Sequence, residues 1–286
     1  MNDNSKIHIL GGGPAGMATS YYASQKKINS VVYEASSAVG GNCKTIKLDG
    51  FYFDLGAHRF HDKNKNVTNE IKKILGDQLL KVHSPSKIFY KDSFLDFPLR
   101  IFNVLTTLKM NDNFKIIYEN LLNQIKTFDD PNNFEEVAYQ NYGKTLSNLF
   151  LINYTEKLWG ESSNKLLPNI SGGRLKNLSL KSIITELFSN QKSKSKHLDG
   201  DFWYPKFGYG TIFELMKKSL YQEFNLNSAI TKLVHDGEKI TQIEINRSEV
   251  INVNNIVSTL PINLLVKFLH PMVDKNLCTI AESLKF

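Results

Sequence analysis

Three glycines near the N-terminus, Gly11, Gly13 and Gly16, have the G-x-G-x-x-G spacing of a phosphate-binding turn. In such a turn the first glycine allows a tight bend, the second lets the backbone approach a pyrophosphate, and the third lets a helix pack closely on a strand. Amides at the start of that helix donate to phosphate oxygens. Glu34 follows at the spacing of an acid that accepts hydrogen bonds from a ribose. These residues predict dinucleotide binding.

Two short apolar runs and one helical segment must position these groups. Residues 6–10 and 30–33 have the pattern of strands, and residues 14–25 have the pattern of a helix between them. The first strand runs into the glycines and the second ends on Glu34. This context favours a dinucleotide site over the alternative, a glycine-rich turn in an ordinary α/β domain. At this level both FAD and NAD remain open as the dinucleotide.

The composition is that of a globular chain whose length suits about two domains. Of its 286 residues, 41% are hydrophobic and 22% are charged. The N-terminus has no apolar signal, no apolar run is long enough for a bilayer, and two cysteines make no disulfide framework. We therefore expect a cytoplasmic protein without a transmembrane segment. The net charge of +7 comes mainly from dispersed lysines without a nucleic-acid-binding motif, so no nucleic-acid partner is expected.

The hydrophobic pattern divides the chain into strand-rich and helix-rich parts. We expect a discontinuous α/β domain at 1–98 and 200–262, interrupted by a mostly helical domain at 99–199, with 263–286 beginning a second segment of the helical domain. The expected helices are 66–75, 101–110, 114–126, 134–141, 145–159 and 180–188. The expected strands are the hairpins 46–53 and 87–97, a meander over 226–253 and a last strand at 254–260.

Histidines and arginines are the remaining candidates for chemistry. His58 and His61 lie three residues apart without further ligands at metal-binding spacing, so no metal site is expected. The chain has only four arginines among many lysines. Arg59 and Arg174 are candidate catalytic residues, because a guanidinium fork suits the diphosphate or carboxylate of a substrate. For Arg174 a surface salt bridge is the alternative.

Several longer motifs resemble the flavin-dependent family that includes amine oxidases, protoporphyrinogen oxidase and UDP-galactopyranose mutase. These motifs are GGGPAG (11–16), Glu34, GGN (40–42), FDLGAHRFH (53–61), NYGKTLSNLFLINYTEKLWG (141–160), YPKFGYGTIFELM (204–216) and NNIVSTLP (254–261). The resemblance covers essentially the whole chain. It implies an α/β fold with a Rossmann-like FAD-binding domain and a β-meander, plus a mostly helical substrate domain. The second glycine pair, the GAHRFH stretch and the late meander favour FAD over NAD.

The resemblance implies that FAD contacts Gly11, Gly13, Pro14, Ala15, Gly16, Glu34, Gly40, Gly41, Asn42, Gly56, Ala57, His58 and Ile230. In that family the glycine turn holds the pyrophosphate, the position of Glu34 binds the adenosine ribose, and the backbone at Ile230 reaches the adenine. Residues 56–58 are expected beside the isoalloxazine. His58 is expected there as a neutral hydrogen-bonding group and a catalytic candidate, with a purely structural role as the alternative.

Two departures from the family pattern bear on function. Members of the family are usually longer and finish with a segment that returns to the flavin, whereas this chain stops at Phe286, so we expect weak retention of FAD. Asn42 stands where amine oxidases commonly have an arginine, and the GGN motif is closer to the mutase pattern. GAHR, by contrast, is closer to relatives of protoporphyrinogen oxidase.

The resemblance leaves three functional hypotheses. The main one is an FAD-dependent oxidoreductase that acts on a small molecule by hydride transfer to the flavin. The first alternative is a flavin-dependent sugar-nucleotide mutase like UDP-galactopyranose mutase, with a nucleotide sugar as its substrate. The second alternative is a truncated, non-catalytic remnant that only binds a dinucleotide.

Overall fold

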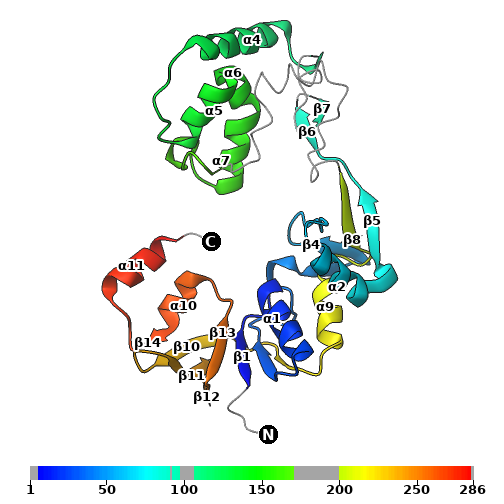
Figure 1. The fold of residues 1–286 in the computed structure, drawn as a ribbon, viewed down its shortest axis with the longest axis vertical. Helices are drawn as coiled ribbons and strands as arrows, with labels where there is room; N and C mark the ends of the chain where they lie inside the picture. The colour runs from blue at the N-terminus through cyan, green and yellow to red at the C-terminus, as the bar shows by residue number, and fades with distance from the viewer. Residues whose placement is uncertain (1–5, 91, 97–105, 171–199, 285–286) are drawn as a thin grey trace. The chain divides into compact units, whose positions relative to one another are not determined.

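The computed structural model describes residues 6–90, 92–96, 106–170 and 200–284. They form two compact units (Figure 1). Unit 1 comprises Met1–Val82 and Phe202–Phe286, and unit 2 comprises His83–Asp201.

A parallel sheet in unit 1 carries the predicted glycine motif. Its strand order is β13 (Asn255–Ser258), β1 (Ile7–Leu10), β2 (Ser30–Tyr33) and β9 (Glu223–Asn225), and every neighbouring pair is parallel. β2 is buried along its whole length, which explains its continuous apolar sequence. The strand expected to begin at residue 226 begins only at Ile230, so its predicted start is wrong. The turn at Asn227, with φ of 54°, separates β9 from this strand.

Three helices pack together in unit 1: α1 (Pro14–Gln25), α2 (Lys65–Leu75) and α9 (Thr211–Lys218). Met17, Ile71 and Phe213, one from each helix, belong to the same buried cluster. α1 has the bounds that the sequence predicts, and α2 begins one residue earlier than expected, after its cap Asn64.

A second sheet contains the predicted meander. β10 (Ile230–His235), β11 (Ile240–Ile245) and β12 (Glu249–Asn252) are antiparallel, and β14 (Leu269–His270) adds to β10 in parallel. Leu233 and Ile243 are fully buried and share a core with Leu10, so the two sheets enclose one cluster. The helices α10 (Ile262–Phe268) and α11 (Lys275–Ser283) follow within unit 1. The segment 263–286, expected to begin a second part of the helical domain, therefore lies in unit 1.

Short strand pairs complete unit 1. β3 (Thr45–Leu48) and β4 (Phe51–Asp54) form the expected hairpin. Its turn residues Asp49 and Gly50 both have positive φ, as a two-residue Asp-Gly turn requires. β5 (Leu79–His83) pairs with β8 (Asp201–Pro205) at the two points where the chain passes between the units.

Unit 2 is mostly helical. It contains the hairpin β6 (Lys87–Tyr90) and β7 (Ser93–Asp96), then α4 (Met110–Ile125), α5 (Phe134–Tyr142), α6 (Lys144–Ser147) and α7 (Asn153–Trp159), with one π-helical turn at Asn148–Ile152 between α6 and α7. Leu95 of the hairpin is buried in the same helical core as Phe134. The hairpin therefore belongs to unit 2, and unit 2 begins at His83 and not at the expected residue 99. The expected helix 180–188 and the first half of 101–110 lie outside the described residues.

Candidate functional site

The carboxyl ends of β13, β1 and β2 lie side by side, because these parallel strands are neighbours. Gly11 follows β1, Glu34 follows β2 and Thr259 follows β13. The Gly11 amide donates to the Tyr33 carbonyl over 2.9 Å, and the Thr259 hydroxyl donates to the Leu10 carbonyl over 3.0 Å. In parallel α/β sheets, ligands bind at this edge.

The glycine turn after β1 does not accommodate side chains at several of its positions, Gly11 and Gly16 among them. Gly11 has φ of +105°, a conformation that residues with a side chain rarely adopt. A Cβ on Gly16 would lie 1.9 Å from the carbonyl oxygen of Gly11, so the start of α1 packs directly on the turn. α1 begins with Pro14, and no side chain of the described residues caps its first turn. The amides there are oriented to donate to an anion.

A second backbone segment crosses the glycine turn. The Gly40 amide donates to the Gly12 carbonyl over 2.8 Å. Gly41 has φ of +53°, and a Cβ on it would lie 3.0 Å from Cα of Gly13. We call Gly11–Gly16 together with Gly40–Gly41 the glycine cradle. Because glycine has no side chain, a pyrophosphate can approach the backbone closely here.

Glu34 is fixed against the cradle by several donors. Its Oε2 accepts from the Gly12 amide over 2.8 Å, and its Oε1 accepts from the amide and hydroxyl of Ser36 over 2.9 and 2.5 Å. Nζ of Lys44 lies 3.7 Å from Oε1. Partial burial acts to raise the pKa of Glu34, but the bonds from Ser36 and Gly12 and the charge of Lys44 outweigh it, so the pKa lies below its usual range. Glu34 is therefore an ionised acceptor at neutral pH.

His58 is tied to the loop that follows the cradle. Its Nε2 lies 3.0 Å from the carbonyl oxygen of Asn42, and because a carbonyl only accepts, Nε2 carries the proton. Nδ1 then accepts from the thiol of Cys43, whose Sγ lies 3.8 Å away. Burial and the charge of Asp54 raise the pKa of the Cys43 thiol, which keeps this donor protonated. The ring of Tyr209 packs on His58 at a centroid distance of 5.1 Å.

Asp54 links this loop to a turn far along the sequence. Its carboxylate accepts from the Thr45 hydroxyl over 2.5 Å, the Tyr204 hydroxyl over 2.5 Å and the Tyr209 amide over 3.0 Å. The Gly210 amide also donates to Thr45 Oγ1 over 2.8 Å. Burial and the bond to Asp54 raise the pKa of Tyr204, so its hydroxyl stays a donor. These bonds attach the β3–β4 hairpin to the turn before α9.

The other predicted site residues are less closely assembled. The guanidinium of Arg59 lies over the ring of Phe202, with Cζ 4.8 Å from its centroid. Ile230 is buried at the start of β10, and the chain just before it is joined to Glu34 by the Ser228 amide, which donates to the Glu34 carbonyl over 2.8 Å. Gly56 and Ala57 are exposed beside His58. The catalytic candidate Arg174 lies outside the described residues.

Sequence reasoning missed several residues that hold the site together, namely Ser36, Lys44, Thr45, Asp54 and Thr259. Asp54 and Tyr204 each lie within a motif that was recognised. Their contact joins positions 150 residues apart. Only co-variation between the two motifs could have revealed that pairing from sequence.

Neither a cluster of metal ligands nor a membrane-spanning helix is found in the described parts of the chain. No group of three or more His, Cys, Asp or Glu side chains there could hold a metal ion. None of the helices in those parts is both long and apolar enough to cross a membrane.

A glycine turn after the first strand of a parallel sheet, with an acid after the second, is typical of α/β proteins that bind a dinucleotide. Residues 14–279 match the family model described as flavin containing amine oxidoreductase. The chain belongs to this family of flavin-dependent enzymes, which confirms the expected family, its mixed helix and strand content and its flavin cofactor.

The proteins to which the chain is similar include both oxidases and mutases. The chain is 21% identical to coproporphyrinogen III oxidase of Bacillus subtilis (strain 168), over 91% of this chain and 61% of that protein. It is 22% identical to dTDP-fucopyranose mutase of Escherichia coli, over 80% of this chain and 58% of that protein. The crystal structure of reduced UDP-galactopyranose mutase superposes with a TM-score of 0.85 at 20% identity, over 99% of this chain and 62% of the other. The chain thus spans about three fifths of the length of the relatives it matches.

Proposed function

We propose that the chain binds FAD in the glycine cradle and acts as an FAD-dependent oxidoreductase on a small molecule. In this proposal unit 1 is a Rossmann-like FAD-binding domain and unit 2 is a substrate domain. The observation that carries the proposal is the approach of Gly41 to Gly13, where two backbone segments meet without side chains at the uncapped start of α1. That arrangement suits a pyrophosphate better than any other common ligand group.

The cradle and the residues beside it fit the adenosine diphosphate part of FAD. The pyrophosphate lies against the amides after Gly13, and the ionised Glu34 accepts hydrogen bonds from the adenosine ribose, since Oε2 keeps a lone pair beside its bond from Gly12. The backbone before Ile230, tied to Glu34 through Ser228, reaches the adenine. When bound, the flavin supplies the group that accepts a hydride from a substrate C–H bond.

His58 has a positioning role in this proposal. Both of its ring nitrogens are engaged within the chain, one as a donor to Asn42 and the other as an acceptor from Cys43. The ring therefore holds the loop that follows Gly41. Arg59, stacked on Phe202, is the described candidate for an anionic group of the substrate. Arg174 remains a prediction for the same task.

The second candidate function is that of a flavin-dependent sugar-nucleotide mutase. It is supported by the similarity to dTDP-fucopyranose mutase over 80% of the chain and by Asn42 in the place of the arginine of amine oxidases. Its substrate would be a nucleotide sugar. The cytoplasmic location and the weak retention of FAD stay predictions.

Anaerobic mixing distinguishes the candidates. FAD-loaded protein is mixed with coproporphyrinogen III, and, in parallel, with UDP-galactose and with dTDP-fucopyranose, before and after reduction by dithionite. Bleaching of the oxidised flavin by an added substrate supports the oxidoreductase. Isomerisation of a nucleotide sugar only after prior reduction supports the mutase. A protein that binds no FAD at all contradicts both candidates and leaves the non-catalytic remnant.

A further inference from the structure

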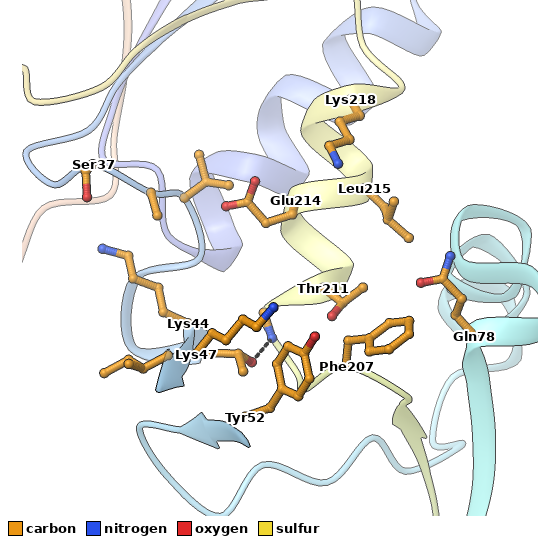
Figure 2. A pocket seen from close by; sticks show the side chains of 15 residues that line it. Ser37, Lys44, Lys47, Tyr52, Gln78, Phe207, Thr211, Glu214, Leu215 and Lys218 are labelled. Atoms are coloured by element: carbon orange, nitrogen blue, oxygen red, sulfur yellow. Dashed lines mark hydrogen bonds between the residues drawn. The ribbon is translucent and has the colours of Figure 1, made fainter. Parts of the chain in front are cut away.

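A cavity of about 490 Å³ lies between the β3–β4 hairpin and α9 in unit 1 (Figure 2). Its volume is in the range of pockets that hold small organic ligands. The walls are formed by residues 37–39, strand β3, Tyr52 of β4, Gln78, and the first two turns of α9. None of the described residues that line it belongs to the glycine cradle, and Glu34 does not line it either. The cavity therefore does not include the glycine cradle, but it borders the proposed FAD site, because Lys44 lines the cavity and also lies 3.7 Å from Glu34.

Positive charge exceeds negative charge in the lining. Lys44, Lys47 and Lys218 line the cavity, with Glu214 as the acid among the described lining residues. Lys44 is engaged by Glu34 and by the Ser36 hydroxyl. Lys47 and Lys218 form no ion pair with any described residue, so their charges are left for a ligand. Figure 2 shows Lys47 extending from β3 towards the first turn of α9.

Two aromatic side chains form an apolar wall beside these amines. The rings of Tyr52 and Phe207 lie 5.6 Å apart between centroids, and the two residues are 44% and 41% exposed. Nζ of Lys47 lies 5.7 Å from the centroid of the Tyr52 ring, which fixes a cation at the edge of the wall. A planar ring placed against Phe207 would remove apolar area from water, with a charged group of the same ligand next to Lys47.

We propose that this cavity binds a small ligand that combines a planar ring with a phosphate. Lysine amines are compact charges that suit a phosphate dianion, and two lysines that form no ion pair with a described residue, Lys47 and Lys218, line the cavity. The ring packs on Tyr52 and Phe207. Glu214, which also lines the cavity, accepts a hydrogen bond from a donor on the ligand, which favours a ring with hydroxyl or amino substituents.

The test uses pyridoxamine 5′-phosphate as the probe, since it carries a ring, a phosphate and donor groups without a reactive aldehyde. Binding is measured by isothermal titration calorimetry, with pyridoxamine and inorganic phosphate as partial probes. We expect each partial probe to bind about tenfold more weakly than the whole probe. Lys47→Gln, Lys218→Gln and Phe207→Leu are each expected to weaken binding of the whole probe about tenfold.

Two control variants decide whether the probe occupies this cavity. Lys239→Gln removes a lysine in the turn before β11, away from the cavity, and is expected to leave the affinity unchanged. Gly13→Ala alters the cradle and is also expected to leave it unchanged. The proposal is overturned if the whole probe does not bind, or if both partial probes bind as tightly as the whole probe. It is also overturned if either control variant weakens binding as much as Lys47→Gln does. Circular dichroism verifies that each variant is folded. The proposal does not depend on the proposed function, because FAD binding is measured separately on the same variants.

Discussion

The backbone amide of Gly12 donates to Oε2 of Glu34 over 2.8 Å, which joins the glycine turn after β1 directly to the acid after β2. A Cβ on Gly12 would also lie 2.9 Å from Cβ of Glu34, so the two segments are in close contact. The acid is thereby held at a fixed distance from the start of α1. A ribose donor and a pyrophosphate on one ligand can then be bound at the same time.

Replacing Glu34 with glutamine should change the stability of the protein towards acid. The pKa of Glu34 in the folded chain lies below its usual value of 4.5. Its ionised form therefore stabilises the fold above that pH, and this contribution is lost as the pH falls through the lowered value. Chemical denaturation at several pH values measures the free energy of unfolding. Between neutral and acidic pH this free energy should fall less in Glu34→Gln than in the wild type. Glu249→Gln, at an exposed position of β12, is the control. Equal pH dependence in wild type and Glu34→Gln would refute the assignment.

Two glycines of the turn should respond differently to substitution by alanine. The Cβ of Gly16→Ala would meet the Gly11 carbonyl at 1.9 Å, so α1 or β1 must move, at a cost of about 3 kcal/mol. The Cβ of Gly13→Ala would lie 3.9 Å from Cα of Gly41, an ordinary contact. Urea denaturation of the FAD-free protein should therefore show a large decrease in the free energy of unfolding for Gly16→Ala and a small decrease for Gly13→Ala. A similar loss in both variants would contradict this packing.

Asp54 and Tyr204 should behave as a coupled pair. Asp54→Asn disturbs three accepted hydrogen bonds and should lower the free energy of unfolding by about 2 kcal/mol, whereas Tyr204→Phe removes one bond and should cost about 1 kcal/mol. Asp54→Asn should also lower the pKa of Tyr204, which burial and Asp54 together raise. Ultraviolet titration of tyrosine ionisation, with Tyr204→Phe to identify the signal, checks this shift. An unchanged titration curve in Asp54→Asn would show that the bond is not formed in solution.

The elements nearest the glycine turn could be predicted because each follows from local pattern. The bounds of α1 and β2 are those expected, since a glycine turn, Pro14 and a continuous apolar run each specify them within a few residues. The Asp49-Gly50 turn likewise fixed the β3–β4 hairpin. Local signals of this kind act over a few residues and need no knowledge of the tertiary fold.

Features that depend on distant contacts could not be predicted. β9 forms because Glu223–Asn225 lies beside β2, and three residues carry too little pattern to indicate a strand. The hairpin β6–β7 belongs to unit 2 because Leu95 is buried beside Phe134, which its own sequence does not reveal. The bond between Asp54 and Tyr204 is of the same kind.

A substitution in the meander should test the shared core of unit 1. Leu233 of β10 is fully buried, so Leu233→Ala should lower the free energy of unfolding by about 2–5 kcal/mol. Val250→Ala in β12, where the side chain is 58% exposed, should change it by less than about 0.5 kcal/mol. Thermal or urea denaturation measures both. Similar values for the two variants would mean that the face of the meander that carries Leu233 is not buried.

The central claim is that the glycine cradle binds FAD, and titration of FAD into the wild type, Gly41→Ala and Gly50→Ala tests it most directly. Gly41 and Gly50 both have positive φ, so alanine strains the backbone in either case. A Cβ on Gly41 would lie 3.0 Å from Gly13, whereas a Cβ on Gly50 has no described atom within 4 Å. We predict that the wild type and Gly50→Ala bind FAD with the same affinity, and that Gly41→Ala binds at least about tenfold more weakly, a loss of about 1.4 kcal/mol. Absence of FAD binding by the wild type, or equal affinity in Gly41→Ala, would contradict the claim.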